Sequence, residues 1–132
     1  MKKLLIIPML FACYMVMGQN AAKIIGKPYQ LKNIEVARND FKNVQTWKDA
    51  IAKCNGLGNG WRLPTLDELD KLYNNKNKIG GFKSGWLDDF YWSSTEASEN
   101  LVYYQCFGDG QKYTSEKRNK NNLYYVRAVR TK

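Results

Sequence analysis

Apolar residues recur at helical spacing in the segment from residue 45 to residue 60. Four of them stand at positions i, i+3, i+4 and i+7, on one helical face: Trp47, Ala50, Ile51 and Cys54. Thr46 precedes this face as a candidate N-cap, and Asp49 follows three residues later, as in a capping box. Gly56 stands where a left-handed residue commonly ends a helix. The pattern therefore predicts a helix that begins after Thr46 and ends near Gly56.

A second helix is predicted within the stretch NGWRLPTLDELDKLY, residues 59–73. Pro64 disfavours helical backbone at the residue before it, so WRLP should be extended, and Thr65 with Glu68 forms a second capping box. The apolar face of this helix has four members: Leu66, Leu69, Leu72 and Tyr73.

The extended piece before the second helix alternates in polarity. Alternation places Trp61 and Leu63 on one side and Arg62 on the other. We therefore expect Trp61 to be a core residue, and Arg62 to pair with a nearby carboxylate that fixes the entry of the helix.

Aromatic and β-branched runs predict strands in five further segments: YQLKNIEVA (29–37), FYWSST (90–95), LVYYQCF (101–107), QKYTSEK (111–117) and LYYVRAVR (123–130). Asp109-Gly110 is a strong signal for a two-residue hairpin between the third and fourth of them. Two polar segments, residues 74–89 and 118–122, predict loops. The order strand, helix, helix and then short antiparallel strands predicts an α+β fold.

The first 18 residues have the composition of a secretory signal peptide. Lys2 and Lys3 precede an almost wholly apolar run at residues 4–17. Val16 and Gly18 are small enough for the −3 and −1 positions of a cleavage site. We therefore expect a signal peptide at residues 1–18, cleaved before Gln19.

A short leader at residues 19–28 and one domain at residues 29–132 should follow the signal peptide. The apolar run is short for a transmembrane anchor, which needs about 20 apolar residues, so no membrane span is expected after cleavage. A lipoprotein acylated at Cys13 is the alternative. Both interpretations predict a secreted, periplasmic or cell-surface protein.

Charge narrows the class of partner. The chain has a formal net charge of +9, and removal of Lys2 and Lys3 with the signal peptide leaves +7. Such an excess favours acidic partners, and for an exported protein these are glycans or envelope polymers rather than nucleic acid. The alternative is that the charge only keeps the surface soluble.

The residue types present argue against catalysis. The chain has no histidine, which removes the usual general base and the commonest zinc ligand. The adjacent carboxylates Asp67-Glu68 and Asp88-Asp89 are not placed across a cleft by any sequence pattern. We therefore expect no enzyme activity, no cofactor and no metal site.

Cys54 and Cys106 are the two cysteines that remain after signal cleavage. Export permits a disulfide between them, but two cysteines alone do not establish one. Cys54 lies on the apolar helix face and Cys106 in a predicted strand that should pack near it. The sequence leaves a bridge and two buried thiols open, with the thiols favoured.

Several of these segments together resemble a known family. TWKDAIAKCNGLGNGWRLPTLDELDKLY, then YWSST, a GDG hairpin and a terminal YVRAVR resemble the Lcl domain, the C-terminal domain of the Legionella collagen-like adhesin. The Fibrobacter succinogenes major paralogous domain has similar segments. The resemblance covers roughly Ile34 to Arg130 and implies a C-type lectin-like fold. In that fold two helices pack on a small twisted antiparallel sheet, the first and last strands lie side by side, and long loops carry any binding.

The chain departs from better-known members of these folds. The Glu-Pro-Asn-like and Trp-Asn-Asp-like tripeptides with which sugar-binding C-type lectins hold calcium are absent. A calcium-dependent lectin mechanism is therefore not expected. Many family members end in VRCVR, but this chain has Ala128 there, which leaves Cys106 as the partner for any bridge from Cys54.

The resulting hypothesis is an exported, non-catalytic recognition or adhesion module for a glycan or an anionic envelope polymer. The alternative is a structural or assembly module that contacts other proteins through its strand edges. Aromatic, basic and amide side chains in the loop-rich half are the candidate ligand-binding residues: Trp86, Tyr91, Tyr103, Lys112, Tyr113, Arg118 and Asn121. Structural roles are expected for a second set: Trp47, Trp61, Arg62, Pro64, Thr65, Glu68, Trp92 and Arg127. The oligomeric state is not predicted.

Overall fold

The computed structural model describes residues 20–132, which form an α+β fold with two small antiparallel sheets. The predicted signal peptide and the acylation site at Cys13 lie outside these residues. The named elements follow one another in this order: β1 (Tyr29–Leu31), β2 (Ile34–Val36), α2 (Trp47–Gly56), α3 (Leu66–Asn74), α4 (Lys76–Ile79), β3 (Phe90–Glu96), β4 (Leu101–Cys106), β5 (Lys112–Glu116) and β6 (Val129–Thr131). A helical segment at residues 20–25 precedes them, within the predicted leader.

The first sheet has the strand order β1-β2-β6. The single strand predicted at residues 29–37 is wrong, because the chain turns at residues 32–33 and forms a hairpin. Lys32 takes a φ of 52° in that turn. Glu35 of β2 faces Arg130 of β6, and the two side chains form an ion pair at 2.8 Å. The last strand thus lies beside the first hairpin, as the family resemblance implies.

The second sheet has the strand order β3-β4-β5, with β5 at its edge. The predicted two-residue hairpin at Asp109-Gly110 is wrong, because the loop between β4 and β5 spans residues 107–111. Phe107 is fully buried and its N–H donates to the carbonyl of Asp89, so it leaves the strand for the core. Gly110 takes a φ of +84° and closes the loop with a hydrogen bond to the carbonyl of Cys106.

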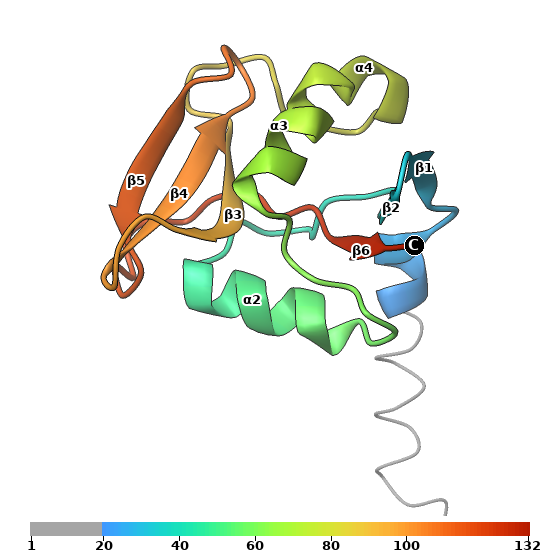
Figure 1. The fold of residues 1–132 in the computed structure, drawn as a ribbon, viewed down its shortest axis with the longest axis horizontal. Coiled ribbons are helices and arrows are strands. Elements are labelled where there is room, and N and C mark those ends of the chain that lie inside the picture. The colour runs from blue at the N-terminus through green and yellow to red at the C-terminus, as the bar shows by residue number, and fades with distance from the viewer. Residues whose placement is uncertain (1–19) are drawn as a thin grey trace, which may run out of the picture.

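The predicted terminal strand at residues 123–130 is only partly regular. Its first half makes isolated bridges, from Tyr124 to Gln45 and from Tyr125 to β3, and β6 covers only its end. The segment changes partners because it crosses from the second sheet to the first. The side chains of Val126 and Ala128 are fully buried on this path. Figure 1 shows the segment running between the two sheets, with α2 below it and α3 above it.

Both predicted helices form with their predicted caps. The Thr46 hydroxyl accepts from the N–H of Asp49, and Thr65 with Glu68 forms a full capping box before α3. α2 ends at Gly56 as predicted, but the left-handed residue after the helix is Gly58, at φ +73°, and not Gly56. The predicted loop after α3 also contains the one-turn helix α4, whose Ile79 is buried.

Two clusters of buried side chains form the core. The first lies against α2 and includes Trp61, Leu63 and Trp92. The second lies against α3 and includes Tyr91 and Phe107. Each helix thus covers its own cluster, which explains why both amphipathic patterns are visible in the sequence.

A buried arginine connects distant parts of the chain. Arg127 is 1% exposed, and its Nε lies 2.7 Å from a carboxylate oxygen of Asp40. Its guanidinium also donates to the carbonyls of Ala37 and Gly80 and stacks 3.9 Å from the centroid of Phe82. Arg127 therefore holds residues 37–40 and 80–82 against the last segment of the chain.

Cys54 and Cys106 are both buried and both free. Of the two alternatives left open by the sequence, the structure has the two thiols. Burial raises the pKa of the Cys54 thiol to about 12. Burial also raises the pKa of Cys106, whose sulfur lies 3.4 Å from the carbonyl oxygen of Leu87.

Candidate functional site

One candidate binding residue is a core residue. The Tyr91 side chain is fully buried, and its hydroxyl donates to Asp40 at 2.5 Å and accepts from the N–H of Lys83 at 2.8 Å. Burial, followed by the Asp40 carboxylate, raises the pKa of Tyr91 above its ordinary value. The prediction that Tyr91 contacts a ligand is therefore wrong. Strand alternation explains the error, because Phe90 and Trp92 point to the other face of β3.

That other face carries a group of packed aromatic rings, which we call the aromatic face: Phe90, Tyr104, Tyr113 and Tyr124. The strand register builds it, since Tyr104 of β4 stands opposite Trp92 of β3 and Tyr113 of β5. Tyr104 and Tyr113 stack at 5.5 Å, and Tyr124 lies 4.5 Å from Tyr104. Trp92 closes the bottom of the group, 1% exposed, with its Nε1 donating to the carbonyl of Gln45.

The aromatic face is partly open to solvent. Tyr113 is 43% exposed, while the other three rings are half-buried. Burial, followed by Tyr104, raises the pKa of the Tyr124 hydroxyl, and burial, followed by Asp109, raises that of Tyr113. Both hydroxyls therefore remain protonated donors at neutral pH. Half-exposed rings with polar tips can stack on a sugar ring and donate to its oxygens.

An exposed apolar tip lies at one end of this face. Trp86 and Leu87 are 75% and 70% exposed. Their carbonyls lie against the thiol of Cys106, which stands opposite Phe90 in the sheet. The N–H of Trp86 donates to the carboxylate of Asp89, and this contact holds the tip in place.

A hollow that we call the basic cleft has a volume of about 710 Å³. Residues from the start of α2 and from the loop after β5 line it: Thr46, Trp47, Lys48, Asp49, Lys117, Arg118, Asn119 and Lys120. Lys117 is already engaged, with Glu96 at 3.0 Å and the Trp47 ring at 5.8 Å. Within residues 20–132, Lys48, Arg118 and Lys120 form no ion pair. Three exposed cations thus remain available to an anion.

The aromatic face and the basic cleft adjoin each other. Residue Asn122, at the end of the cleft loop, donates to the hydroxyl of Ser115 on β5, and the loop then leads into Tyr124. On the α2 side, Gln45 pairs with Tyr124 while Trp47 donates from its Nε1 to the carbonyl of Ser93. The two features can therefore contact one extended ligand.

The remaining predicted ligand-binding residues lie either on the opposite face of the second sheet or in the loop after β5. Tyr103 and Lys112 lie on the opposite face of the second sheet, where Lys112 approaches Asp70 of α3 at 3.6 Å. Asn121 is exposed in the cleft loop, and its N–H donates to the side chain of Asn119. Of the predicted binding set, the structure thus places Tyr113 on the aromatic face, Trp86 at the exposed tip, and Arg118 and Asn121 in the loop after β5. Tyr103 and Lys112 lie on the opposite face of the sheet.

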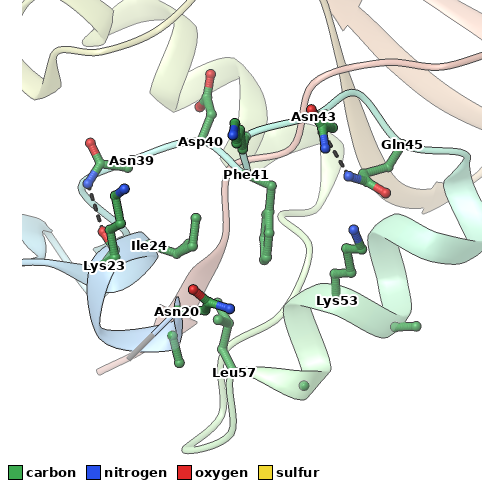
Figure 2. A pocket seen from close by; sticks show the side chains of 14 residues that line it. Asn20, Lys23, Ile24, Asn39, Asp40, Phe41, Asn43, Gln45, Lys53 and Leu57 are labelled. Carbon is green, nitrogen blue, oxygen red and sulfur yellow. Dashed lines mark hydrogen bonds between the residues drawn. The ribbon is translucent and has the colours of Figure 1, made fainter. Parts of the chain in front are cut away.

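A larger groove, of about 850 Å³, lies between residues 20–24, residues 39–45 and α2 (Figure 2). Ile24, Phe41 and Leu57 supply apolar surface, and lysines and amides surround them. Asn39 donates to the carbonyl of Lys23, which fixes the first helical segment to one wall. The groove begins at Asn20, the first residue that the structure describes, and contains none of the predicted binding residues.

The expected carboxylate partner of Arg62 is Glu68. The two side chains form a bidentate pair at 2.6 and 2.8 Å, while Glu68 also accepts from the N–H of Thr65. Burial raises the pKa of the Glu68 carboxyl, but the hydrogen bonds from Arg62 and Thr65 outweigh burial and hold it below its ordinary value. Pro64 is buried beside them. Arg62 thus clamps the start of α3.

Within residues 20–132 no group of three or more histidine, cysteine or acidic side chains could hold a metal ion. Searched over the same residues, no helix has the length and hydropathy that a membrane crossing requires.

The sequence pattern of the Lcl C-terminal domain family matches residues 20–130, which are most of the chain. The chain belongs to the Lcl C-terminal domain family. A comparison with curated proteins finds no significant match.

Solved structures establish the fold independently. Botrocetin superposes with a TM-score of 0.58 at 11% identity, over 81% of this chain and 98% of botrocetin. A botrocetin complex with a mutant von Willebrand factor A1 domain gives 0.53, also at 11%, over 81% of this chain and 98% of that chain. EMS16 superposes with a TM-score of 0.52 at 12% identity, over 80% of this chain and 97% of the EMS16 chain. These neighbours are C-type lectin-like snake venom proteins, so this Lcl domain has the expected C-type lectin-like fold.

Sequence reasoning missed three members of the aromatic face, Phe90, Tyr104 and Tyr124. The alternation FYW at residues 90–92 and YY at residues 103–104 carried the signal, since every second residue shares a face. Tyr124 gave no such signal, because its neighbours come from strands far away in the sequence.

Proposed function

We propose that this Lcl domain is an exported, non-catalytic recognition module that binds an acidic glycan or envelope polymer across the aromatic face and the basic cleft. The family is that of an adhesin domain. The observation that supports the ligand class is the adjacency of half-exposed tyrosine rings and three unpaired cations on one side of the domain.

The two features supply different kinds of interaction. Cations at Lys48, Arg118 and Lys120 attract a polyanion, and because they are exposed, salt should screen this attraction over about 8–10 Å. Stacking on Tyr113 and Tyr104 depends on apolar burial and ring geometry, which salt affects little. Affinity for an acidic polysaccharide should therefore fall with added salt without vanishing.

Calorimetric titration with dextran sulfate and polygalacturonate, with neutral dextran as the uncharged control, tests this proposal. The double variant Arg118→Ala/Lys120→Ala should bind about tenfold more weakly at low salt, because two charge-assisted contacts are lost. The matched control Lys71→Ala/Lys78→Ala removes the same charge from exposed positions on α3 and α4 and should change affinity little.

Tyr113→Ala should remove the salt-resistant part of the affinity, because the stacking ring is lost. The fold should be kept, since this ring is exposed and contributes little to the core. Chelating agents should have no effect on binding, because the chain lacks the calcium tripeptides. Equal losses in the cleft and control variants, or complete loss of binding at moderate salt for every acidic polymer, would contradict the proposal. Either result would mean that net charge alone causes retention.

A protein partner is the second candidate, and the exposed tip Trp86-Leu87 favours it. Large apolar side chains at such exposure commonly mark contact sites. Two of the structural neighbours are described with protein partners, botrocetin with the A1 domain of von Willebrand factor and EMS16 as an antagonist of a collagen receptor integrin. Saturable binding that Trp86→Ala abolishes and Arg118→Ala leaves unchanged would support this candidate over the glycan.

A further inference from the structure

The outer edge of β5 carries unpaired backbone groups. β5 is the last strand of the second sheet, and Figure 1 shows it outermost at the left of the view. The N–H of Cys106 donates to the carbonyl of Gln111, and the N–H of Lys117 to that of Asn100. Because the bonds of an antiparallel ladder alternate, the odd-numbered residues of β5 face β4. Lys112, Thr114 and Glu116 therefore direct their N–H and carbonyl groups outward.

These outward groups have few partners within residues 20–132. The carbonyl of Glu116 accepts from the N–H of Asn119, and no backbone bond to the outer side of Lys112 or Thr114 is formed. A bare strand edge is a template for another strand. The length and composition of β5 decide which strand fits it.

The sequence of β5, KYTSE, is complementary to itself. We propose that β5 pairs antiparallel with β5 of a second copy, centred on Thr114, and forms one continuous six-stranded sheet. In this register Thr114 faces Thr114 and Lys112 faces Glu116 of the other copy, twice by symmetry. It places all three outward residues of each copy opposite a partner, whereas a shift by two residues would leave one of them without one. The Glu116 carbonyl, which already accepts from Asn119, has a second lone pair for the N–H of the opposite Lys112.

Charge complementarity favours a second copy over another strand. Both Lys112 and Glu116 are exposed, and in the proposed pairing each lysine stands directly opposite a glutamate. A symmetric pairing of a strand with like charges at its two ends would instead place like charges opposite each other. On the other face Tyr113 stands opposite Ser115, where an open tyrosine ring gains a neighbour.

The edge has little of the protection that natural sheets use against pairing. β5 has five residues and no proline, and Lys112 is its one cation. The cleft loop after Glu116 turns toward Tyr124 on the aromatic side, where Asn122 donates to Ser115. It therefore leaves the outer backbone of residues 112–114 open.

Sedimentation equilibrium of the purified protein over a wide concentration range tests the pairing. The wild type should associate reversibly to dimers. Glu116→Lys should weaken association by about tenfold or more, because it places lysine opposite lysine at both ends of the pairing. The matched control Asp67→Lys makes a similar charge change on α3 and should associate like the wild type.

Charge exchange gives the decisive comparison. Lys112→Glu/Glu116→Lys restores complementarity and should restore dimers, and a mixture of the Lys112→Glu and Glu116→Lys single variants should form mixed dimers. Thr114→Pro should also block pairing while it leaves the β4–β5 bonds intact, since its N–H points outward. Far-ultraviolet circular dichroism verifies that each variant is folded. A wild type that stays monomeric at high concentration, or a double variant as weak as Glu116→Lys, would overturn the proposal.

Discussion

Replacing Arg127 by methionine should destabilise the domain more than any substitution on its surface. The guanidinium is buried, pairs with Asp40 at 2.7 Å and donates to the carbonyls of Ala37 and Gly80. Methionine fills similar space beside Phe82 but leaves the buried carboxylate of Asp40 without its cation and two carbonyls without the guanidinium, while the Tyr91 hydroxyl still donates to Asp40. Breaking a buried pair by removing one partner typically costs about 3–5 kcal/mol. For a domain of this size the loss should lower Tm by roughly 10–25 °C.

The pH dependence of this loss has a defined sign. Burial raises the pKa of Asp40, and the lowering effect of Arg127 only partly offsets it. Without Arg127 the pKa should rise further, so the folded state binds a proton more tightly than the unfolded chain. Folding stability of the variant should then fall as pH rises through the folded pKa of Asp40. The difference between wild type and variant should therefore shrink as the solution is acidified.

Urea denaturation at pH 7 and at mildly acidic pH measures both effects. The double variant Asp40→Asn/Arg127→Met removes both charges, so it should lose clearly less stability than Arg127→Met alone. The reasoning is refuted if Arg127→Met loses less than about 1 kcal/mol, or if the double variant is the less stable of the two.

Two further predictions concern the helices. Arg62→Ala should lower stability by about 1–2 kcal/mol, because the pair with Glu68 is only partly buried, and ligand affinity should fall only as far as unfolding explains. The ion pair with ionised Glu68 contributes fully to folding stability above the pKa that Glu68 has in the unfolded chain, and this contribution is lost as pH falls through the lower pKa of the folded state. The stability difference between wild type and Arg62→Ala should therefore shrink as the solution is acidified. Cys54 should resist a thiol reagent at pH 8 in the folded protein and react after unfolding in guanidinium, since burial raises its pKa to about 12. Rapid labelling of the folded chain at Cys54 would show that the helix opens.

Local patterns carried enough information to predict the helices. The capping box of Thr65 and Glu68 and the apolar spacing of Leu69 and Leu72 act within one segment, so the sequence displays them directly. The end of α2 at Gly56 was predicted, but its left-handed residue was not, because two glycines stand close together there and the backbone uses the later one, Gly58.

Tertiary contacts explain the errors in the strands. The turn at Asp109-Gly110 has the local signal of a tight hairpin, but burial of Phe107 and its bond to Asp89 draw the chain into a longer loop. The ion pair of Arg127 with Asp40 joins residues 87 positions apart. No periodicity within one segment reports such partners, so Arg127 could be predicted as structural but its partner could not.

The candidate site was predictable in its residue types and less so in its geometry. Exposed Trp86, Tyr113 and Arg118 follow from their place in loops and at an edge strand. The prediction that Tyr91 contacts a ligand failed because neighbouring strand residues point to opposite faces, and the sequence does not show which face packs against the core. Tyr124 joins the aromatic face only because the last segment crosses beside β3.

Pairing through β5 would change how the domain binds a polymer. Residues that face each other across antiparallel strands lie on the same side of a sheet, so both aromatic faces and both basic clefts would lie on one side of the dimer. A long acidic chain could then contact both copies, and the second contact would benefit from a high effective concentration. Thr114→Pro, which blocks pairing without a change of charge beside the cleft, should accordingly weaken retention on an immobilised acidic polysaccharide while leaving affinity for a short acidic oligosaccharide unchanged. Equal losses for both ligands would instead mean that the substitution alters the site within one copy, and loss of neither would mean that binding needs one domain alone.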